Sequence, residues 1–315
     1  MSQISIIIHS VVAALVCFAI ITIFAISYYM FCRIIKRAPY TELGASKTEK
    51  RKVVNGKRKI AMEEFKKIEK ENLEILSFDN LTLRAKLWRS DNSKKIIICV
   101  HGYTSHPARE FANISPFLHG LGYNILYLND RAHADSDGKY VGFSVLDRYD
   151  LQKWIFTATK MFGDDSSIFL YGISMGASTA ALVSGMDIPP TVKGVIFDSG
   201  FTSPWDELKI MLKSEAHLPA FPFLYIMNML NIIFAKYSLK DTNVIDYIKD
   251  AKIPFIFFRG TDDIAVSMEM TKEIYDACPT AKELHIVEGA EHVGAYYHDT
   301  KLYENSVKAF LKRNE

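Results

Sequence analysis

A serine flanked by two glycines, in the stretch GISMG from Gly172 to Gly176, is the first feature of this sequence that could do chemistry. It follows the apolar run SIFLY and leads into GASTAALVSGM, which has the small and apolar residues of a buried helix. At a strand-to-helix turn a serine is held in a strained conformation with its hydroxyl lifted clear of the sheet, and flanking glycines leave room for the bend. The helix N-terminus behind it presents N–H groups to a developing anion. This setting predicts a nucleophile at Ser174.

Two loops after later apolar runs offer the base and the acid that a serine nucleophile needs. The run IPFIFF is followed by RGTDDIAVS, which contains Asp262 and Asp263, and the run ELHIVE is followed by GAEHVGAY, which contains His292. The order serine, acid, histidine is the order expected when the serine occupies such a turn. No other histidine follows the last strand at loop distance. We therefore expect His292 to be the base, while the residues alone leave the choice of aspartate open.

The elements that would position these residues alternate between short apolar runs and longer amphipathic stretches. Buried strands are expected at 95–100, 123–128, 167–172, 192–197, 253–258 and 283–288, after a hairpin of LEILSF and LTLRAKLW around Asp79-Asn80. Strands separated by helix-length connections predict a mostly parallel, doubly wound sheet, here of eight strands. A helix is expected at 60–73, where Met62, Phe65 and Ile68 have near-helical spacing.

The N-terminal segment 1–32 contains a charge-free run from Val11 to Cys32, VVAALVCFAIITIFAISYYMFC. About 22 helical residues span about 33 Å, enough for the hydrocarbon core of a bilayer, and Tyr28 and Tyr29 suit its interface. A cleaved signal peptide is the alternative, with AIS as the cleavage site. However, the stretch before the run has no Lys or Arg, and the run is too long for the apolar part of a signal peptide. We expect a single-pass membrane protein held in the lipid bilayer by residues 11–32.

The distribution of charge gives this anchor an orientation. Residues 33–59 carry ten Lys or Arg and two Glu, a local charge of +8, so the rest of a chain with a net charge of +2 carries −6. Positive charge after the helix and none before it predicts that the catalytic domain, residues 60–315, faces the cytoplasm. The basic segment has turn formers and no periodicity, which predicts a solvated linker, with contact to anionic lipids as the alternative. An otherwise acidic chain argues against nucleic-acid binding.

The connection after the sixth expected strand is longer than one helix requires, and we call residues 201–240 the insertion. It contains LPAFPFLYIMNMLNIIFAKY, whose prolines and asparagines leave an uninterrupted helix of only about 13 residues, too short to cross a bilayer. We expect a helical lid over the site instead. Phe223 and Met227 are candidates for an adaptable apolar wall against the substrate.

At this point the chain resembles the α/β-hydrolase superfamily over residues 70–313, through the motifs HGYTS, DRAHADSDG, GISMG, GTDDIAV and GAEHVGAY. Within it, the chain is similar to bacterial membrane-anchored serine hydrolases of an esterase-like or aminopeptidase-like branch. The resemblance implies the α/β-hydrolase fold and a catalytic triad, and it assigns the acid to Asp263, three residues after Gly260 and three before Val266. The sequence departs from the family pattern at four supporting positions: Arg259 for histidine, Ser267 for proline, and Ala132 and Ala134 for glycines.

The stretch VHGYTSHP is expected to complete the oxyanion hole. The backbone N–H of Tyr103 would act with that of Met175, the residue after the nucleophile. His101, Arg131 and His133 are interpreted as loop scaffolding rather than groups that touch the substrate.

Together these residues predict hydrolysis of small or amphiphilic carboxylic esters through an acyl-enzyme, with peptide or amide cleavage as the alternative on the same triad. A serine at the turn excludes the aspartate nucleophile that epoxide or haloalkane hydrolysis needs. A catalytically silent, membrane-tethered binding module is disfavoured, because no triad member is lost. The four cysteines show no metal-ligand spacing. We expect no metal, no organic cofactor and no obligate protein partner.

Overall fold

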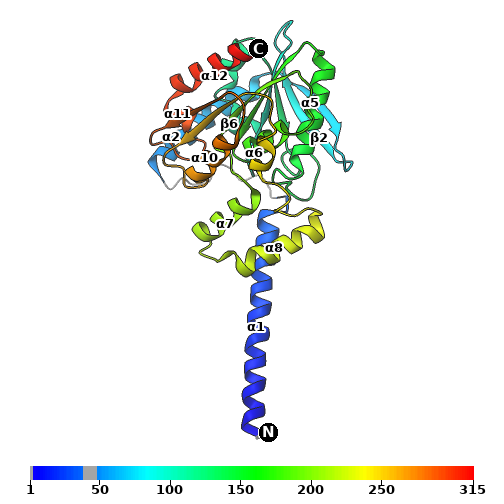
Figure 1. Cartoon of the computed structure of the whole chain (residues 1–315), viewed down its shortest axis with the longest axis vertical. Helices are drawn as coiled ribbons and strands as arrows, with labels where there is room; N and C mark the ends of the chain where they lie inside the picture. The colour runs from blue at the N-terminus through cyan, green and yellow to red at the C-terminus, as the bar shows by residue number, and fades with distance from the viewer. Residues whose placement is uncertain (1–2, 38–47) are drawn as a thin grey trace.

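The computed structural model describes residues 3–37 and 48–315, which form an eight-stranded sheet between two layers of helices (Figure 1). The strand order is β1-β2-β4-β3-β5-β6-β7-β8; β1 and β2 pair antiparallel, β2 joins β4 antiparallel, and β3 to β8 are parallel. The strands are β1 Glu71–Leu76, β2 Thr82–Trp88, β3 Lys95–Val100, β4 Asn124–Asn129, β5 Ser167–Ile173, β6 Val192–Asp198, β7 Phe255–Gly260 and β8 Lys282–Val287. All eight lie within two residues of their predicted positions.

Side chains alternate between the two faces of the sheet, and each face carries its own buried cluster. In β3, Ile96 and Ile98 belong to one cluster, and Ile97 and Cys99 belong to the other. The first face is covered by α5 Asp147–Phe162, α6 Met175–Ser184, α9 Val244–Ile248 and α10 Met268–Ala277. The second is covered by α2 Glu49–Lys67, α3 Pro107–Phe111, α4 Ser115–Gly120, α11 Ala295–His298 and α12 Thr300–Asn314. Burial on both faces explains why the parallel strands read as continuous apolar runs.

Helix α2 corrects two predictions. The helix expected at 60–73 spans Glu49–Lys67, and β1 already begins at Glu71. The described part of the expected linker, after residue 47, is therefore helical and not a solvated tether; residues 38–47 lie outside the described residues. The side chain of Thr48 caps the N-terminus of α2. The buried residues of the helix are Val54, Arg58 and Phe65. A buried arginine interrupts the apolar pattern, so hydrophobic periodicity alone places the helix start too late.

Helix α1, Gln3–Ile34, projects from the rest of the molecule as a long rod (Figure 1). Among the described residues it is the one helix long and apolar enough to cross a membrane. Its side chains are almost all exposed up to Thr22, whereas Ser27, Met30 and Phe31 are buried against the protein. The last part of the predicted span 11–32 is therefore covered by protein.

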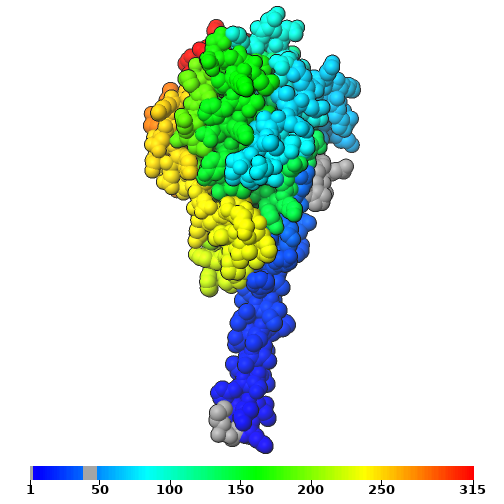
Figure 2. Space-filling view, turned by 90° about the vertical axis from the view of Figure 1, so that its right-hand side faces the viewer, coloured from blue at the N-terminus to red at the C-terminus, as the bar shows by residue number. Residues whose placement is uncertain are grey.

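The insertion folds as α7 Pro204–Glu215 and α8 Ala220–Ala235, with non-helical backbone at Phe221. As predicted, neither helix reaches the length of a membrane span. A third buried cluster joins α8, the end of α1 and the active-site loops; among its members are Met30, Leu224, Leu230 and Met175. Figure 2 shows the insertion against the domain-proximal end of α1. The insertion thus packs against both α1 and the edge of the sheet that holds the candidate nucleophile.

Candidate active site

Ser174 lies between β5 and α6 with a φ of 54° and a ψ of −117°, a conformation that L side chains rarely adopt. The turn is tight on both sides. A Cβ on Gly172 would overlap the carbonyl oxygen of Gly176, and a Cβ on Gly176 would overlap the carbonyl oxygen of Val100. Both glycines of GISMG are thus required sterically, and together they allow the serine to stand above the sheet edge.

The structure brings Ser174, His292 and Asp263 together in one chain of hydrogen bonds, although they come from three separate loops. His292 Nε2 lies 3.0 Å from Ser174 Oγ, and His292 Nδ1 lies 2.8 Å from Asp263 Oδ2. Because an ionised carboxylate only accepts hydrogen bonds, Nδ1 carries the proton and Nε2 is left to accept from the serine hydroxyl. This is the geometry of a nucleophile with its general base and an orienting acid. The other candidate, Asp262, instead pairs with Lys50 at 2.7 Å on the surface.

Asp263 is held from several sides. Its Oδ1 accepts from the N–H groups of Ala265 and Val266 at 2.9 and 3.1 Å, and its Oδ2 is also paired with the buried guanidinium of Arg259. Burial alone would raise the pKa of Asp263, but the nearby His292 and Arg259 outweigh it, and the pKa is lowered. Arg259 also donates to the carbonyl of Val266. The residue that departs from the family pattern thus fixes the acid loop and keeps the acid ionised.

Burial alone would lower the pKa of His292, but Asp263 and then Glu207 raise it above its ordinary value. Glu207 is on α7, and its Oε2 is buried without a hydrogen bond to any described residue. Burial raises the pKa of Glu207 to about 7. The insertion therefore brings a second carboxyl group into the electrostatic environment of the candidate base.

The loop after β3 runs beside the nucleophile, as the predicted oxyanion hole requires. A Cβ on Gly102 would lie 3.3 Å from Ser174 Cβ. In the part of the chain that the structure describes, neither the N–H of Tyr103 nor that of Met175 donates to another backbone or side-chain group outside regular helix and strand bonding. Both are thus available to an anion next to Ser174.

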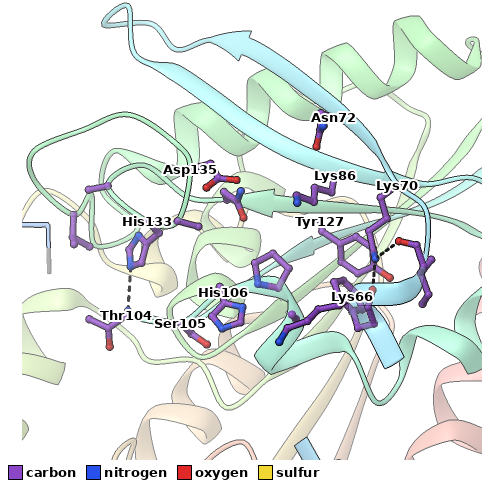
Figure 3. Close-up of a pocket in the computed structure, with 18 residues that line it drawn as sticks. Lys66, Lys70, Asn72, Lys86, Thr104, Ser105, His106, Tyr127, His133 and Asp135 are labelled. Carbon is purple, nitrogen blue, oxygen red and sulfur yellow. Dashed lines mark hydrogen bonds between the residues drawn. The ribbon is translucent and has the colours of Figure 1, made fainter. Parts of the chain in front are cut away.

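Three further polar residues hold loops, as the sequence predicts. His101 is buried, with Nδ1 2.8 Å from the Gly102 carbonyl and Nε2 3.2 Å from the Asp130 N–H. His133 Nε2 accepts from the N–H of Thr104 at 3.1 Å, a bond drawn in Figure 3. Arg131 forms ion pairs with Asp150 at 2.6 Å and with Asp79 at 3.0 Å. These contacts fix the loops after β3 and β4.

Helix α2 holds the histidine loop from outside. Arg51 Nη1 donates to the backbone carbonyl of His292 at 2.7 Å, and Lys50 Nζ donates to the carbonyl of Gly289 at 3.1 Å. About two turns further along α2, the buried Arg58 donates to the Tyr297 hydroxyl at 3.2 Å. Helix α2 thus positions the loop of the candidate base.

The end of α1 holds the opposite side of the site. The hydroxyl of Tyr103 donates to the carbonyl of Ile34 at 2.9 Å, and the N–H of Val141 donates to the carbonyl of Ile35 at 2.8 Å. The N–H of Arg37 donates to the carbonyl of Lys139 at 2.8 Å. The end of α1 and the residues after it are thus bonded to the loop of Tyr103 and to the loop after β4.

The two lid candidates lie at different depths. Met227 is completely buried in the third cluster together with Met175, whereas Phe223 is only partly buried beside that cluster. Met227 therefore supports the lid rather than facing open space, and Phe223 is the better placed of the two to meet a substrate.

A cavity of about 470 Å³ opens beside the site, between the end of α2, β4 and the loop after β3. Figure 3 shows Lys66, Lys70 and Lys86 toward one part of it and His133 toward another. Burial, and then the charge of Lys86, lower the pKa of Lys70 to about 8. Neither Ser174 nor His292 lines this cavity, so it lies next to the candidate chemistry and not at it. Within the described residues, no group of three His, Cys, Asp or Glu side chains could hold a metal ion.

Comparison with known proteins agrees with this geometry. A family model described as serine aminopeptidase, S33, matches residues 91–246, which include Ser174 and end before Asp263. The solved esterase Pf2001 of Pyrococcus furiosus is similar with a TM-score of 0.64 and 26% identity, over 79% of this chain and 92% of that chain. The chain belongs to the α/β-hydrolase superfamily. The predicted resemblance to this superfamily is confirmed.

Two other relatives extend the comparison of this α/β hydrolase. Est1E of Butyrivibrio proteoclasticus, solved with ferulic acid bound, has a TM-score of 0.59 at 19% identity over 77% of this chain and 98% of that chain, and this likeness shows the fold alone. The uncharacterized protein YqkD of Bacillus subtilis (strain 168) is 28% identical over 221 residues, which are 70% of this chain and 72% of that protein. The family match and the esterase neighbours identify the chain as a hydrolase.

Sequence reasoning missed three residues of the site: Arg51, Glu207 and Arg259. Arg259 is visible in the sequence as a departure from the family pattern, which could have marked it as a partner of the acid. Arg51 and Glu207 give no local signal, because they reach the histidine from 241 and 85 positions away in the sequence.

Proposed function

We propose that this α/β hydrolase is a membrane-anchored serine esterase that cleaves small or amphiphilic carboxylic esters. The observation that carries the proposal is the hydrogen-bonded chain from Ser174 Oγ through His292 to Asp263. The similarity to an esterase at 26% identity supports ester chemistry.

In the acylation step, Ser174 Oγ attacks the ester carbonyl carbon while His292 Nε2 takes the hydroxyl proton. The carbonyl π electrons move onto oxygen, and the N–H groups of Tyr103 and Met175 stabilise that oxyanion. When the intermediate collapses, the bond to the alkoxy oxygen breaks, and His292 gives its proton to the departing alcohol. Ionised Asp263 stabilises the imidazolium throughout.

In the deacylation step, His292 takes a proton from water, and the hydroxide attacks the acyl carbon. Collapse of the second intermediate breaks the bond to Ser174 Oγ, which recovers its proton from His292. The products are one carboxylic acid and one alcohol. No step requires a metal or an organic cofactor.

Anchoring by α1 is supported by its contacts with the rest of the chain. A signal sequence is removed after export, whereas the end of α1 is hydrogen-bonded to Tyr103 and buries Phe31 in the protein. We propose that α1 remains as a permanent anchor. The ten basic residues of 33–59 favour a cytoplasmic catalytic domain, and a C-terminal fusion reporter tests that side.

Cleavage of an aminoacyl amide is a second candidate, favoured by Glu207 and by the description of the matching family. A carboxyl group near the base, with one buried oxygen (Oε2) that has no hydrogen bond to a described residue, could bind a protonated amino group, whose positive charge would balance the negative charge of the carboxylate. Its pKa of about 7 means that it ionises readily when a cation arrives.

The test uses the full chain in detergent micelles. A fluorophosphonate should label the protein at Ser174, and Ser174→Ala should abolish both labelling and ester turnover. Turnover should be compared between p-nitrophenyl esters of increasing chain length and aminoacyl anilides. Each methylene that enters an apolar pocket is worth about 0.8 kcal/mol, roughly fourfold in kcat/KM, until the pocket is full.

Faster cleavage of anilides than of every ester would replace the esterase proposal with the peptidase. Labelling that survives Ser174→Ala would overturn the nucleophile. Phe223→Ala should flatten the dependence on chain length while leaving acetyl ester turnover nearly unchanged, and Met227→Ala, at a buried position, should act mainly through stability.

A further inference from the structure

Helix α8 presents an apolar outer face to its surroundings. No charged residue occurs from Leu218 to Ala235. Its inner face is buried, but six large apolar or aromatic side chains point outward with 46–72% of their surface exposed: Phe221, Tyr225, Met229, Ile232, Ile233 and Phe234. Their spacing of three and four residues places most of them on one stripe. Exposing an apolar stripe of this kind to water costs free energy, so the stripe indicates that something covers it.

The length of α1 shows where the bilayer would end. The helix has 32 residues, about 48 Å at 1.5 Å per residue. A hydrocarbon core of about 30 Å takes up about 20 of them. Residues 3–22 match this number, and the side chains of nearly all of them are exposed. The remaining part, from Ile23, is the part that packs against protein, and there Phe31 meets Phe234 of α8 with ring centroids 5.8 Å apart. The apolar face of α8 therefore begins where the bare span of α1 stops (Figures 1 and 2).

Aromatic and basic side chains at this level match a membrane interface. Trp205 and Phe221 pack edge-on against Tyr225, with centroids 5.0 and 5.7 Å apart. The ammonium of Lys240 lies 3.9 Å from the Trp205 ring centroid. The ammonium of Lys36, just after α1, lies 5.6 Å from the ring centroid of Tyr28 on α1. Amphipathic aromatic side chains such as Trp and Tyr, together with lysines whose ammonium groups reach the headgroups, are characteristic of the boundary between lipid and water.

We infer that α8 is an interfacial helix whose outer face lies in the headgroup and acyl boundary of the bilayer that α1 crosses. The inference rests on the proposed anchoring. The inner face of α8 belongs to the same buried cluster as Met175, the residue after the nucleophile. The active site is thus one helix away from lipid, and the substrate class that fits is an ester dissolved in the membrane, which reaches the site past α8.

The test measures depth in the full chain, reconstituted in vesicles of phosphatidylcholine with phosphatidylglycerol as the minor lipid. An environment-sensitive fluorophore is attached at Phe221→Cys or Met229→Cys, after replacement of Cys17 and Cys32 by serine; Cys99 and Cys278 are buried and stay unlabelled in the folded protein. Phe156→Cys on α5 is the matched control, since Phe156 is 48% exposed but lies on the body of the domain. Native Cys17, labelled alone, is the deep reference.

Lipids with a quencher near the headgroup should quench the α8 probes several-fold more than the Phe156 probe, and lipids with a deep quencher should quench the Cys17 probe best. If the Cys17 probe is quenched while the α8 probes behave like the Phe156 probe, the inference is overturned. If the α8 probes are unquenched but shielded in a larger particle, a second copy covers the face, and the inference is also wrong. An unquenched Cys17 probe overturns the anchoring and this inference with it.

A second measurement separates this inference from ester hydrolysis itself. The pair Phe221→Asp and Ile233→Asp should reduce turnover of a long-chain ester held in the vesicles by about tenfold, and turnover of water-soluble p-nitrophenyl acetate by less than about twofold. Phe156→Asp should change neither. Equal loss on both esters would contradict entry past α8. If the α8 probes are quenched as expected but the wild-type protein hydrolyses neither ester, the proposed function is contradicted and the placement of α8 stands.

Discussion

Replacing Arg51 tests whether α2 positions His292, the proposed catalytic base. Its guanidinium donates to the backbone carbonyl of His292 at 2.7 Å, and its charge lowers the pKa of the imidazole. Arg51→Gln removes the charge and weakens the bond. Lys52→Gln is the matched control, because Lys52 is the next residue and pairs with Glu49 at 2.6 Å on the exposed side of α2.

The size of the effect follows from the two contacts. A hydrogen bond from a charged group is worth about 1.5–3 kcal/mol. The loop is also held by Lys50 and Arg58, so we expect about half of that in the transition state, a fall in kcat of about three- to tenfold. Loss of this positive charge removes its repulsion of the protonated imidazole, so the pKa of His292 rises in Arg51→Gln.

The sign of the pH effect is fixed by the mechanism. The base must be neutral, so activity is lost as pH falls through the pKa of His292. Because Arg51→Gln raises that pKa, the acid limb of kcat/KM for p-nitrophenyl acetate should move to higher pH. Arg51→Lys keeps the positive charge, so the acid limb should return to its wild-type position. Part of the loss in kcat should remain, because lysine does not reproduce the guanidinium hydrogen bond to the His292 carbonyl. A profile that coincides with wild type, or a limb that moves to lower pH, would refute the positioning role.

Three other perturbations probe the site. Asp263→Asn should lower kcat by about 10⁴ through a misoriented imidazole, whereas Asp262→Asn, at an exposed ion pair, should change kcat little; the reverse ranking would reassign the acid. Ionised Glu207 raises the pKa of the imidazole, but with its own pKa at about 7 it is only partly ionised across the acid limb. Glu207→Gln should therefore move the acid limb slightly to lower pH, opposite to Arg51→Gln; a limb that moves to higher pH would show that Glu207 does not act on the base in this way. Gly176→Ala should destabilise the fold by about 1–3 kcal/mol in thermal unfolding because its Cβ meets backbone, whereas Gly56→Ala, with open space at that position, should not destabilise it; equal melting temperatures for the two variants would contradict the steric argument.

The strands and the order of the catalytic loops could be predicted because both depend on local sequence. Strands buried on two faces are continuous apolar runs, and turns that follow them carry Ser174, Asp263 and His292. What could not be predicted depends on pairs distant in sequence. Arg58 is buried only because it meets Tyr297, and Arg51 matters only because it meets the histidine loop. In a linear pattern both are ordinary members of a basic run.

The late boundary predicted at residue 60 has a practical consequence. A soluble fragment that starts there would cut α2 near its middle and remove Arg51 and Arg58 from the histidine loop. Low activity of such a fragment would therefore report the loss of these contacts and not the loss of the membrane.

The attachment of α1 to the loop of Tyr103 changes how the enzyme would meet its substrate. A catalytic domain on a flexible linker sweeps a volume, and its encounters depend on substrate concentration in water. Here Ile34 of α1 accepts from the hydroxyl of Tyr103, and the residues directly after α1 bond to Val141 and Lys139 in the loop after β4, so that with α1 in a bilayer the active site keeps one height above the lipid. The search becomes two-dimensional: encounter rates would scale with the number of substrate molecules per unit of membrane area and with lateral diffusion. Diluting the bilayer with inert lipid would then slow turnover, even though the total amounts of enzyme and substrate in the sample stay constant.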